Sequence, residues 1–196
     1  MNFCAESVGG CTPVVQTGGA GLIPSSALQS SELVFSLMPK ADAVAFVQKH
    51  HSRLSKCQAG PWKFAFAATH PSAGVVAVAL WNNPSARTLP GHWLELRRLA
   101  CAPIAPPNTC SRFLGWMVRY FKRGYPQHEK CISYQDLDVH KGTIYKASGW
   151  VVEYVSKRRT RDRSKPRKGT ERAYRSNLNG VLIDAAPKAR WAIRLF

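Results

Sequence analysis

The hydrophobic pattern of the chain switches several times between the periods of strands and helices. Large aromatic side chains occupy every second position of residues 62–66, which predicts a half-buried strand. The apolar run from Val75 to Trp81 predicts a buried strand, and Pro71 with Gly74 predicts the turn that joins the two as a hairpin. Four further strands are predicted at residues 33–37, 93–101, 131–136 and 150–155, the last of them as a core strand.

Three segments have the helical period instead. They cover residues 41–56, 110–124 and 140–148, and Asn108 or Thr109 can cap the second helix. In the first helix, helical spacing relates Val44, Val47, His51 and Leu54. In the second helix, the side chains expected to face inward are Phe113, Met117 and Phe121. Those expected to face outward are Arg112, Arg119, Lys122 and Arg123.

The order of these elements is typical of mixed α/β folds, because strands and helices alternate in the second half. With 196 residues, of which 45% are hydrophobic, the chain can bury the core of one domain. We expect an N-terminal arm or first strand at residues 1–37, a core domain at 38–156 and a basic C-terminal segment at 157–196.

The charge of the chain is strongly one-sided. Lys and Arg number 28 against 11 Asp and Glu, which gives a formal net charge of +17 and indicates a polyanionic partner: DNA, RNA or an anionic membrane. The basic residues are densest in 157–175, where they can neutralise phosphates, although a solvated tail without a partner is the alternative. The candidate nucleic-acid contacts are Arg158, Arg159, Arg161, Arg163, Lys165, Arg167 and Lys168. We favour nucleic acid, because the rest of the chain is also basic.

Other composition signals exclude several classes. No run of about 18 apolar residues is present, and the N-terminus has no signal-peptide pattern, so no membrane span or export is expected. The six cysteines form no Cys-x-x-Cys pair. They are expected to be free thiols in a reducing compartment, and a zinc site is not expected.

Two places carry candidate chemistry. Asp136 follows Ser133 and Tyr134 at the end of a predicted strand, with His140 close behind, and a carboxylate at a strand end is a common part of α/β sites. An Asp that caps a turn is an equally good interpretation. His50 and its neighbour His51 lie on the first predicted helix, where an imidazole could bind a metal or move a proton, although a surface pair is the alternative.

Four segments together resemble the Mom family of GNAT-like phage DNA-modification proteins, over about residues 38–155. They are Leu94-Glu-Leu-Arg-Arg-Leu, Ala105-Pro-Pro-Asn-Thr-Cys-Ser-Arg112, Ile132-Ser-Tyr-Gln-Asp136 and Gly142-Thr-Ile-Tyr-Lys-Ala147. The resemblance implies a GNAT-like mixed central sheet flanked by helices, with a basic C-terminal extension. It also implies conversion of adenine in double-stranded DNA to an N6-carbamoylmethyl form, which shields the DNA from restriction in the cytoplasm of the host bacterium. The family is associated with iron.

By position, the resemblance places His50 and Asp136 near the metal or the reacting amine, with Ser133 and Tyr145 close by. His50-His51-Ser52 is similar to the His-Tyr-Ser segment of the family, with His51 in place of its Tyr. The target base must leave the stack, and Trp81 or Trp93 could hold it, although both are better core residues.

The loop before the second helix separates this chain from ordinary acetyltransferases of the GNAT class, which bind a pyrophosphate there on a Gly-rich loop. Pro103, Pro106 and Pro107 remove three N–H donors, so we expect acetyl-CoA to bind weakly or not at all. The helix start could still hold a phosphate through Asn108, Thr109, Ser111 and Arg112, or it could simply be a capped helix.

Two other functions fit the same sequence. One is conventional GNAT acetylation of a protein, a tRNA or a small amine, which would require acetyl-CoA. The other is a DNA-binding accessory protein on a GNAT-like scaffold, which would bind DNA without changing the mass of any base. The sequence leaves the oligomeric state open, a dimer included.

Overall fold

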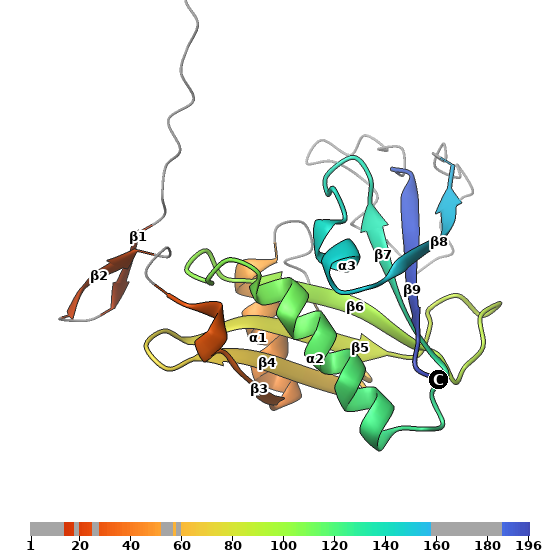
Figure 1. Cartoon of the computed structure of the whole chain (residues 1–196), viewed down its shortest axis with the longest axis horizontal. Coiled ribbons are helices and arrows are strands. Elements are labelled where there is room, and N and C mark those ends of the chain that lie inside the picture. Colours follow the sequence, from red (N-terminus) through yellow and green to blue (C-terminus); the bar gives the residue numbers. More distant parts are fainter. Residues whose placement is uncertain (1–13, 18–19, 25–27, 52–56, 58–59, 158–185) are drawn as a thin grey trace, which may run out of the picture. The chain divides into compact units, whose positions relative to one another are not determined.

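The computed structural model describes residues 14–17, 20–24, 28–51, 57, 60–157 and 186–196 (Figure 1). A seven-stranded sheet has the strand order β3-β4-β5-β6-β7-β9-β8, and a separate two-stranded sheet pairs β1 (Val14–Thr17) with β2 (Ala20–Pro24). The larger sheet is mixed, because β6 and β7 are parallel whereas β7 and β9 are antiparallel. The predicted mixed α/β class is therefore confirmed.

The chain forms two compact units. The first comprises Met1–Trp81 and Arg98–Trp116, and the second comprises Asn82–Arg97 and Met117–Phe196. Three elements cross from one unit to the other: β5 (Gly74–Asn82), whose last residue belongs to the second unit, β6 (Leu94–Cys101) and the helix α2 (Thr109–Gly124).

The first unit contains the predicted hairpin. β4 (Phe64–His70) pairs antiparallel with β5 (Gly74–Asn82) from Phe64 opposite Trp81 to His70 opposite Gly74. β3 (Val34–Leu37) pairs with the other edge of β4, and the short 3-10 helix Ser30–Glu32 precedes it. His70 is buried, and its Nε2 lies 3.0 Å from the Glu32 carboxylate, which ties the 3-10 helix to the strand.

The helix α1 (Lys40–His50) begins one residue before the predicted start at residue 41 and buries Val44 and Val47. They belong to a core cluster that contains Trp62, Val78 and Leu80. The prediction that this helix extends to residue 56 is wrong. The helix ends at His50, because His51 has an extended backbone (φ −79°, ψ 119°) that an α-helix cannot include.

The helix α2 has the faces that the sequence predicts. Phe113, Met117 and Phe121 are fully buried, whereas the basic side chains are exposed. No helix among the described residues is long and apolar enough to cross a membrane.

In the second unit, β7 (Lys130–Asp136) pairs antiparallel with β9 (Lys188–Arg194) over its whole length. β8 (Val151–Ser156) pairs with the other side of β9, and the short helix α3 (Thr143–Ala147) lies within the predicted range 140–148 (Figure 1).

The prediction of a core strand at residues 150–155 is wrong. β8 is an edge strand with exposed side chains, and β9 lies between it and β7. The strand β9 was not predicted, because its basic side chains are similar to those of the basic segment that precedes it. Its alternation is nonetheless that of a strand, with Lys188 and Arg190 on one face and Ala189 and Trp191 on the other.

Candidate active site

The candidate active site lies in the second unit, where β6 and β7 stop pairing. The two parallel strands pair at three positions, and the last of them joins Leu96 to Ser133. The Ser133 hydroxyl donates a hydrogen bond to the Leu96 carbonyl at 3.2 Å and lies 2.8 Å from the Tyr145 hydroxyl. Because a serine has a single O–H donor, Tyr145 must then donate to Ser133. Both side chains are buried.

A glycine determines where the helix that carries Tyr145 begins. Gly142 has a φ of +70° directly before α3, a left-handed conformation that glycine adopts without strain. A Cβ atom there would lie 2.6 Å from Gln135 Oε1 and 2.7 Å from Trp191 Cζ2. The backbone can therefore approach the sheet this closely only because residue 142 has no side chain.

The Tyr145 ring is held by two tryptophans. It stacks on Trp191 with ring centroids 5.3 Å apart and meets the edge of Trp150 at 5.7 Å. Trp191 donates from Nε1 to Gln135 Oε1 at 2.6 Å, and Gln135 donates to the His140 carbonyl. The hydroxyl of Tyr145 is therefore presented at a defined position by packing and hydrogen bonds together.

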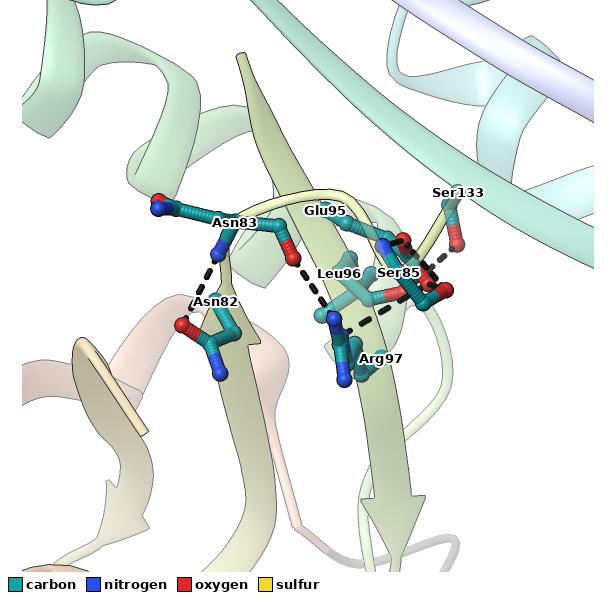
Figure 2. Close-up of polar contacts among 7 residues, drawn as sticks. All are labelled: Asn82, Asn83, Ser85, Glu95, Leu96, Arg97 and Ser133. Carbon is teal, nitrogen blue, oxygen red and sulfur yellow. Dashed lines mark hydrogen bonds and ion pairs between the residues drawn. The ribbon is translucent and has the colours of Figure 1, made fainter. Parts of the chain in front are cut away.

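A buried carboxylate lies on the next strand (Figure 2). Glu95 is 6% exposed, and it accepts hydrogen bonds from the backbone N–H of Ser85 at 2.7 Å and from the Ser85 hydroxyl at 3.0 Å. Arg97 Nε lies 3.8 Å from the same carboxylate, and Arg97 also donates to the Asn83 carbonyl at 2.7 Å. The loop that follows β5 thus satisfies this carboxylate at the start of β6.

Glu95 and Ser133 lie on opposite faces of the sheet. The register pairs Glu95 with Ile132, and side chains alternate along a strand, so the neighbouring Ser133 faces the other way. Glu95 is not among the predicted site residues, although a carboxylate between two leucines of an apolar strand is an available signal in the sequence. The supporting residues Gln135 and Trp191 were not predicted either, because their contact joins residues far apart in the chain.

Of the residues predicted for catalysis, the structure brings Ser133 and Tyr145 together. Asp136 ends β7 and is half-buried, and its carboxylate accepts from the Asp138 backbone N–H at 3.1 Å. Its carbonyl also accepts from the His140 backbone N–H at 3.0 Å. These bonds are those of a residue that caps the turn after a strand.

His50 is the last residue of α1 and belongs to the first unit. Its ring centroid lies 4.4 Å from that of Phe46, and partial burial, with the charge of Lys49, lowers the pKa of the imidazole. Asp136 belongs to the second unit. The expectation that both residues lie near the same metal or reacting amine therefore stays a prediction.

At the start of α2 the predicted phosphate contacts have local partners. The Thr109 hydroxyl donates to the Pro106 carbonyl at 2.6 Å, and the Ser111 hydroxyl donates to the Asn108 carbonyl at 3.0 Å. Asn108 itself has a φ of +64°, and Arg112 is exposed. Among these candidates, Arg112 is the one that presents its charge to solvent.

The structure bears only in part on the predicted metal site and the predicted DNA contacts. Within the described ranges, no group of three or more His, Cys, Asp or Glu side chains is placed to hold a metal ion. The predicted DNA contacts from Arg158 to Lys168 lie outside the described residues.

The fold is similar to that of solved acetyltransferases. The ribosomal-protein-S18-alanine N-acetyltransferase from Escherichia coli is 13% identical, with a TM-score of 0.51 over 83% of this chain and 94% of that chain. A spermidine/spermine N-acetyltransferase from Vibrio cholerae is 12% identical, with a TM-score of 0.55 over 85% and 94%. An acetyltransferase of the GNAT family from Streptococcus pneumoniae is 10% identical, with a TM-score of 0.52 over 83% and 99%. Identities this low show the GNAT-like fold alone.

The family follows from the sequence itself. No curated protein sequence matches the chain. The pattern of the Mom protein family matches residues 32–183, a range that contains β3 to β8 and the Ser133–Tyr145 pair. The match covers well over half of the 196 residues and agrees with the fold. The chain therefore belongs to the Mom protein family and has a GNAT-like α/β fold.

Proposed function

We propose that this protein is a transferase that modifies the N6 amine of adenine in double-stranded DNA, with a carbamoylmethyl-type group, and so protects the DNA from restriction. The observation that carries the proposal is the buried pair of hydroxyls on Ser133 and Tyr145, at the end of the β6–β7 pairing. Membership of the Mom family supports the DNA substrate, and the GNAT-like fold supports group transfer. The net charge of +17 fits a polyanionic substrate.

The chemistry requires a proton acceptor. The N6 amine is a weak nucleophile, because its lone pair is delocalised into the purine ring. As N6 forms a bond to the incoming carbon, it releases one proton, and a carboxylate within hydrogen-bond reach accepts it. Asp136, at the end of β7, is our candidate by family position. Glu95 is the second candidate, because it is buried, is ordered by Ser85 and Arg97, and faces the same side of the sheet as Asp136, opposite Ser133.

We assign to the Ser133–Tyr145 hydroxyl pair the role of giving a proton to the leaving group. Tyr145 is fixed by Trp191 and Trp150, so when its single O–H turns away from Ser133 it can be aimed at an atom on which negative charge develops. Ser133 connects that hydroxyl to the Leu96 carbonyl. A proton given to the leaving group balances the proton lost by the amine.

The cofactor predictions separate this protein from its structural relatives. We expect no tight binding of acetyl-CoA, because Pro103, Pro106 and Pro107 lack the N–H donors that a pyrophosphate would need. The Thr109 and Ser111 hydroxyls also already donate to backbone carbonyls. An association with iron is tested by metal analysis of the purified protein.

The decisive test is mass spectrometry of nucleosides from the DNA of cells that express the protein. We expect a modified deoxyadenosine with wild type and at least a tenfold loss with Ser133→Ala and Tyr145→Phe. Full yield from either folded variant would sink the assigned site. The pair Asp136→Asn and Glu95→Gln then decides which carboxylate accepts the proton.

The rival function is ordinary N-acetylation, and the acetyltransferases of similar fold are the observation in its favour. Calorimetric titration separates the two. Micromolar binding of acetyl-CoA would favour the rival, whereas DNA binding without any change in base mass would favour an accessory DNA-binding protein.

A further inference from the structure

One face of the second unit carries a row of aromatic and basic side chains. Arg190 on β9 is the register partner of Tyr134 on β7 and of Tyr154 on β8. Register partners point to the same face of a sheet. Tyr134, Arg190 and Tyr154 therefore form one row across three strands, which we call the Tyr–Arg–Tyr row. Ser133 and Trp191, which contact Tyr145 of α3, lie on the opposite face.

A β-bulge arranges the outer end of this row. The register shifts between Val152 and Tyr154, so Glu153 has no partner residue on β9. The shift turns Tyr154 to the same face as Arg190, and it lets Glu153 reach Arg190 Nε at 3.1 Å and Lys130 Nζ at 2.6 Å. The irregularity thus aims specific side chains, as bulges near binding sites commonly do.

Arg190 is oriented while Tyr154 stays accessible. The guanidinium carbon of Arg190 lies 5.5 Å from the centroid of the Tyr154 ring, a cation–π arrangement. The ion pair with Glu153 fixes the guanidinium, whereas Tyr154 is 50% exposed on an edge strand. The row therefore presents an ordered ring to solvent, beside an ordered planar cation whose side chain is 19% exposed.

The charge of this face is positive. Among the described residues of β6 to β9, register, alternation and contacts place these charged side chains on it: Glu95, Arg97, Lys130, Asp136, Glu153, Lys188, Arg190 and Arg194. Five of them are basic and three are acidic, so two positive charges remain after pairing. An aromatic ring beside a surplus of positive charge suits an unpaired nucleotide, because the base can stack and its phosphates can be neutralised.

We propose that the Tyr–Arg–Tyr row is a binding site for an unpaired nucleobase and its flanking phosphates. The base stacks on Tyr154 and on the guanidinium of Arg190. The inference rests on the proposed function, since a DNA adenine modified at N6 has to be taken out of the base stack. It goes further in assigning particular residues to the unpaired nucleotide.

The experiment measures DNA affinity of the full chain by fluorescence anisotropy. The probes are a fully paired duplex and the same duplex with one bulged adenine. We expect wild type to prefer the bulged duplex, and Tyr154→Ala to reduce affinity for the bulged duplex about fivefold or more with little effect on the paired one. Tyr154→Phe should keep the preference, because it keeps the ring.

Val155→Ala is the matched control. Val155 is similarly exposed and pairs with Ala189, so it lies on the other face of β8. This variant should bind both probes as wild type does. Unchanged preference in a Tyr154→Ala protein with a wild-type melting temperature would overturn the inference. The inference would also be overturned if Tyr154→Ala changed the mass of the protein measured by sedimentation but not its preference for the bulged duplex. The row would then be a contact between copies of the chain.

A second measurement tests the site without the alanine variant, in case that variant folds poorly. Photocrosslinking of wild type to a bromouracil-substituted single strand should label the peptide that contains residues 151–157, and labelling confined to other peptides would refute the site.

The binding site and the transferase function can be refuted separately. If the preference for the bulged duplex depends on Tyr154 but no modified adenine is found, only the transferase function is refuted. If a Tyr154→Ala protein still modifies adenine and still prefers the bulged duplex, only this binding site is refuted.

Discussion

Gly142 shows how a single residue can decide whether the candidate active site forms. The site needs a left-handed residue where the backbone lies against Gln135 and Trp191, and a Cβ atom fits neither requirement. Gly142→Ala should lower the free energy of unfolding by about 2 kcal/mol or more, from backbone strain and overpacking together. Urea unfolding measures the change.

Gly91→Ala is the control for that prediction, because no atom lies within 4 Å of the added Cβ and the residue has no positive φ. Its effect should stay within about 0.5 kcal/mol. Equal stability of the two variants would mean that the backbone at residue 142 relaxes at little cost.

A further prediction at the residue scale concerns His50 and Asp136. We predict that His50→Ala and Asp136→Ala each abolish adenine modification while folding and DNA affinity stay nearly intact, because both groups are expected to act on the reacting amine or on a metal. The measurements are modified-adenine yield, melting temperature and DNA affinity. If a metal is involved, both variants also lose bound iron. Full yield from a well-folded Asp136→Ala protein would contradict the prediction.

At the scale of elements, the ion group of Lys130, Glu153 and Arg190 joins the edge strand β8 to β9 and β7. The hydrogen bond from Lys130, with the charges of Lys130 and Arg190, holds the pKa of Glu153 below its usual value of 4.5. A carboxyl group whose pKa is lower in the folded state contributes stability that is present above the unfolded pKa. That contribution is lost as the pH falls through the folded pKa.

Glu153→Gln should therefore be less stable than wild type at pH 7, and the difference should shrink as the pH falls below about 4.5. Chemical unfolding at several pH values tests this. A constant difference at all pH values would show that the titration of Glu153 does not contribute to stability.

At the scale of the whole molecule, the charge predicts how DNA binding depends on salt. Neutralising Arg158, Arg159, Arg161 and Arg163 should weaken binding and flatten the slope of log affinity against log salt by about 0.9 for each lost phosphate contact. A salt titration with a duplex of arbitrary sequence measures the slope.

A matched control for the salt titration neutralises the four exposed basic residues of α2, which are Arg112, Arg119, Lys122 and Arg123. It removes the same formal charge from another part of the chain. We expect a smaller change in slope from this variant. A slope that stays unchanged in the 158–163 variant would remove that stretch from the DNA interface.

The sequence by itself determined the features that depend on near neighbours in the chain. Periodicity located the hairpin, β6, α2 and β7, because burial of one face imposes a period on each element. The inward residues Phe113, Met117 and Phe121 followed from the same rule. The family motifs pointed to Ser133 and Tyr145, and composition alone predicted a polyanionic partner.

Only the tertiary structure decided what depends on contacts between distant residues. It placed β9 between β7 and β8, which joins residues more than fifty positions apart, as in the hydrogen bond from Trp191 to Gln135. It buried Glu95 beside Ser85 and brought the Ser133 and Tyr145 hydroxyls to 2.8 Å. The physical reason is that strand order and register are set by global packing, whereas the hydrophobic period of a segment reports only which of its faces is buried.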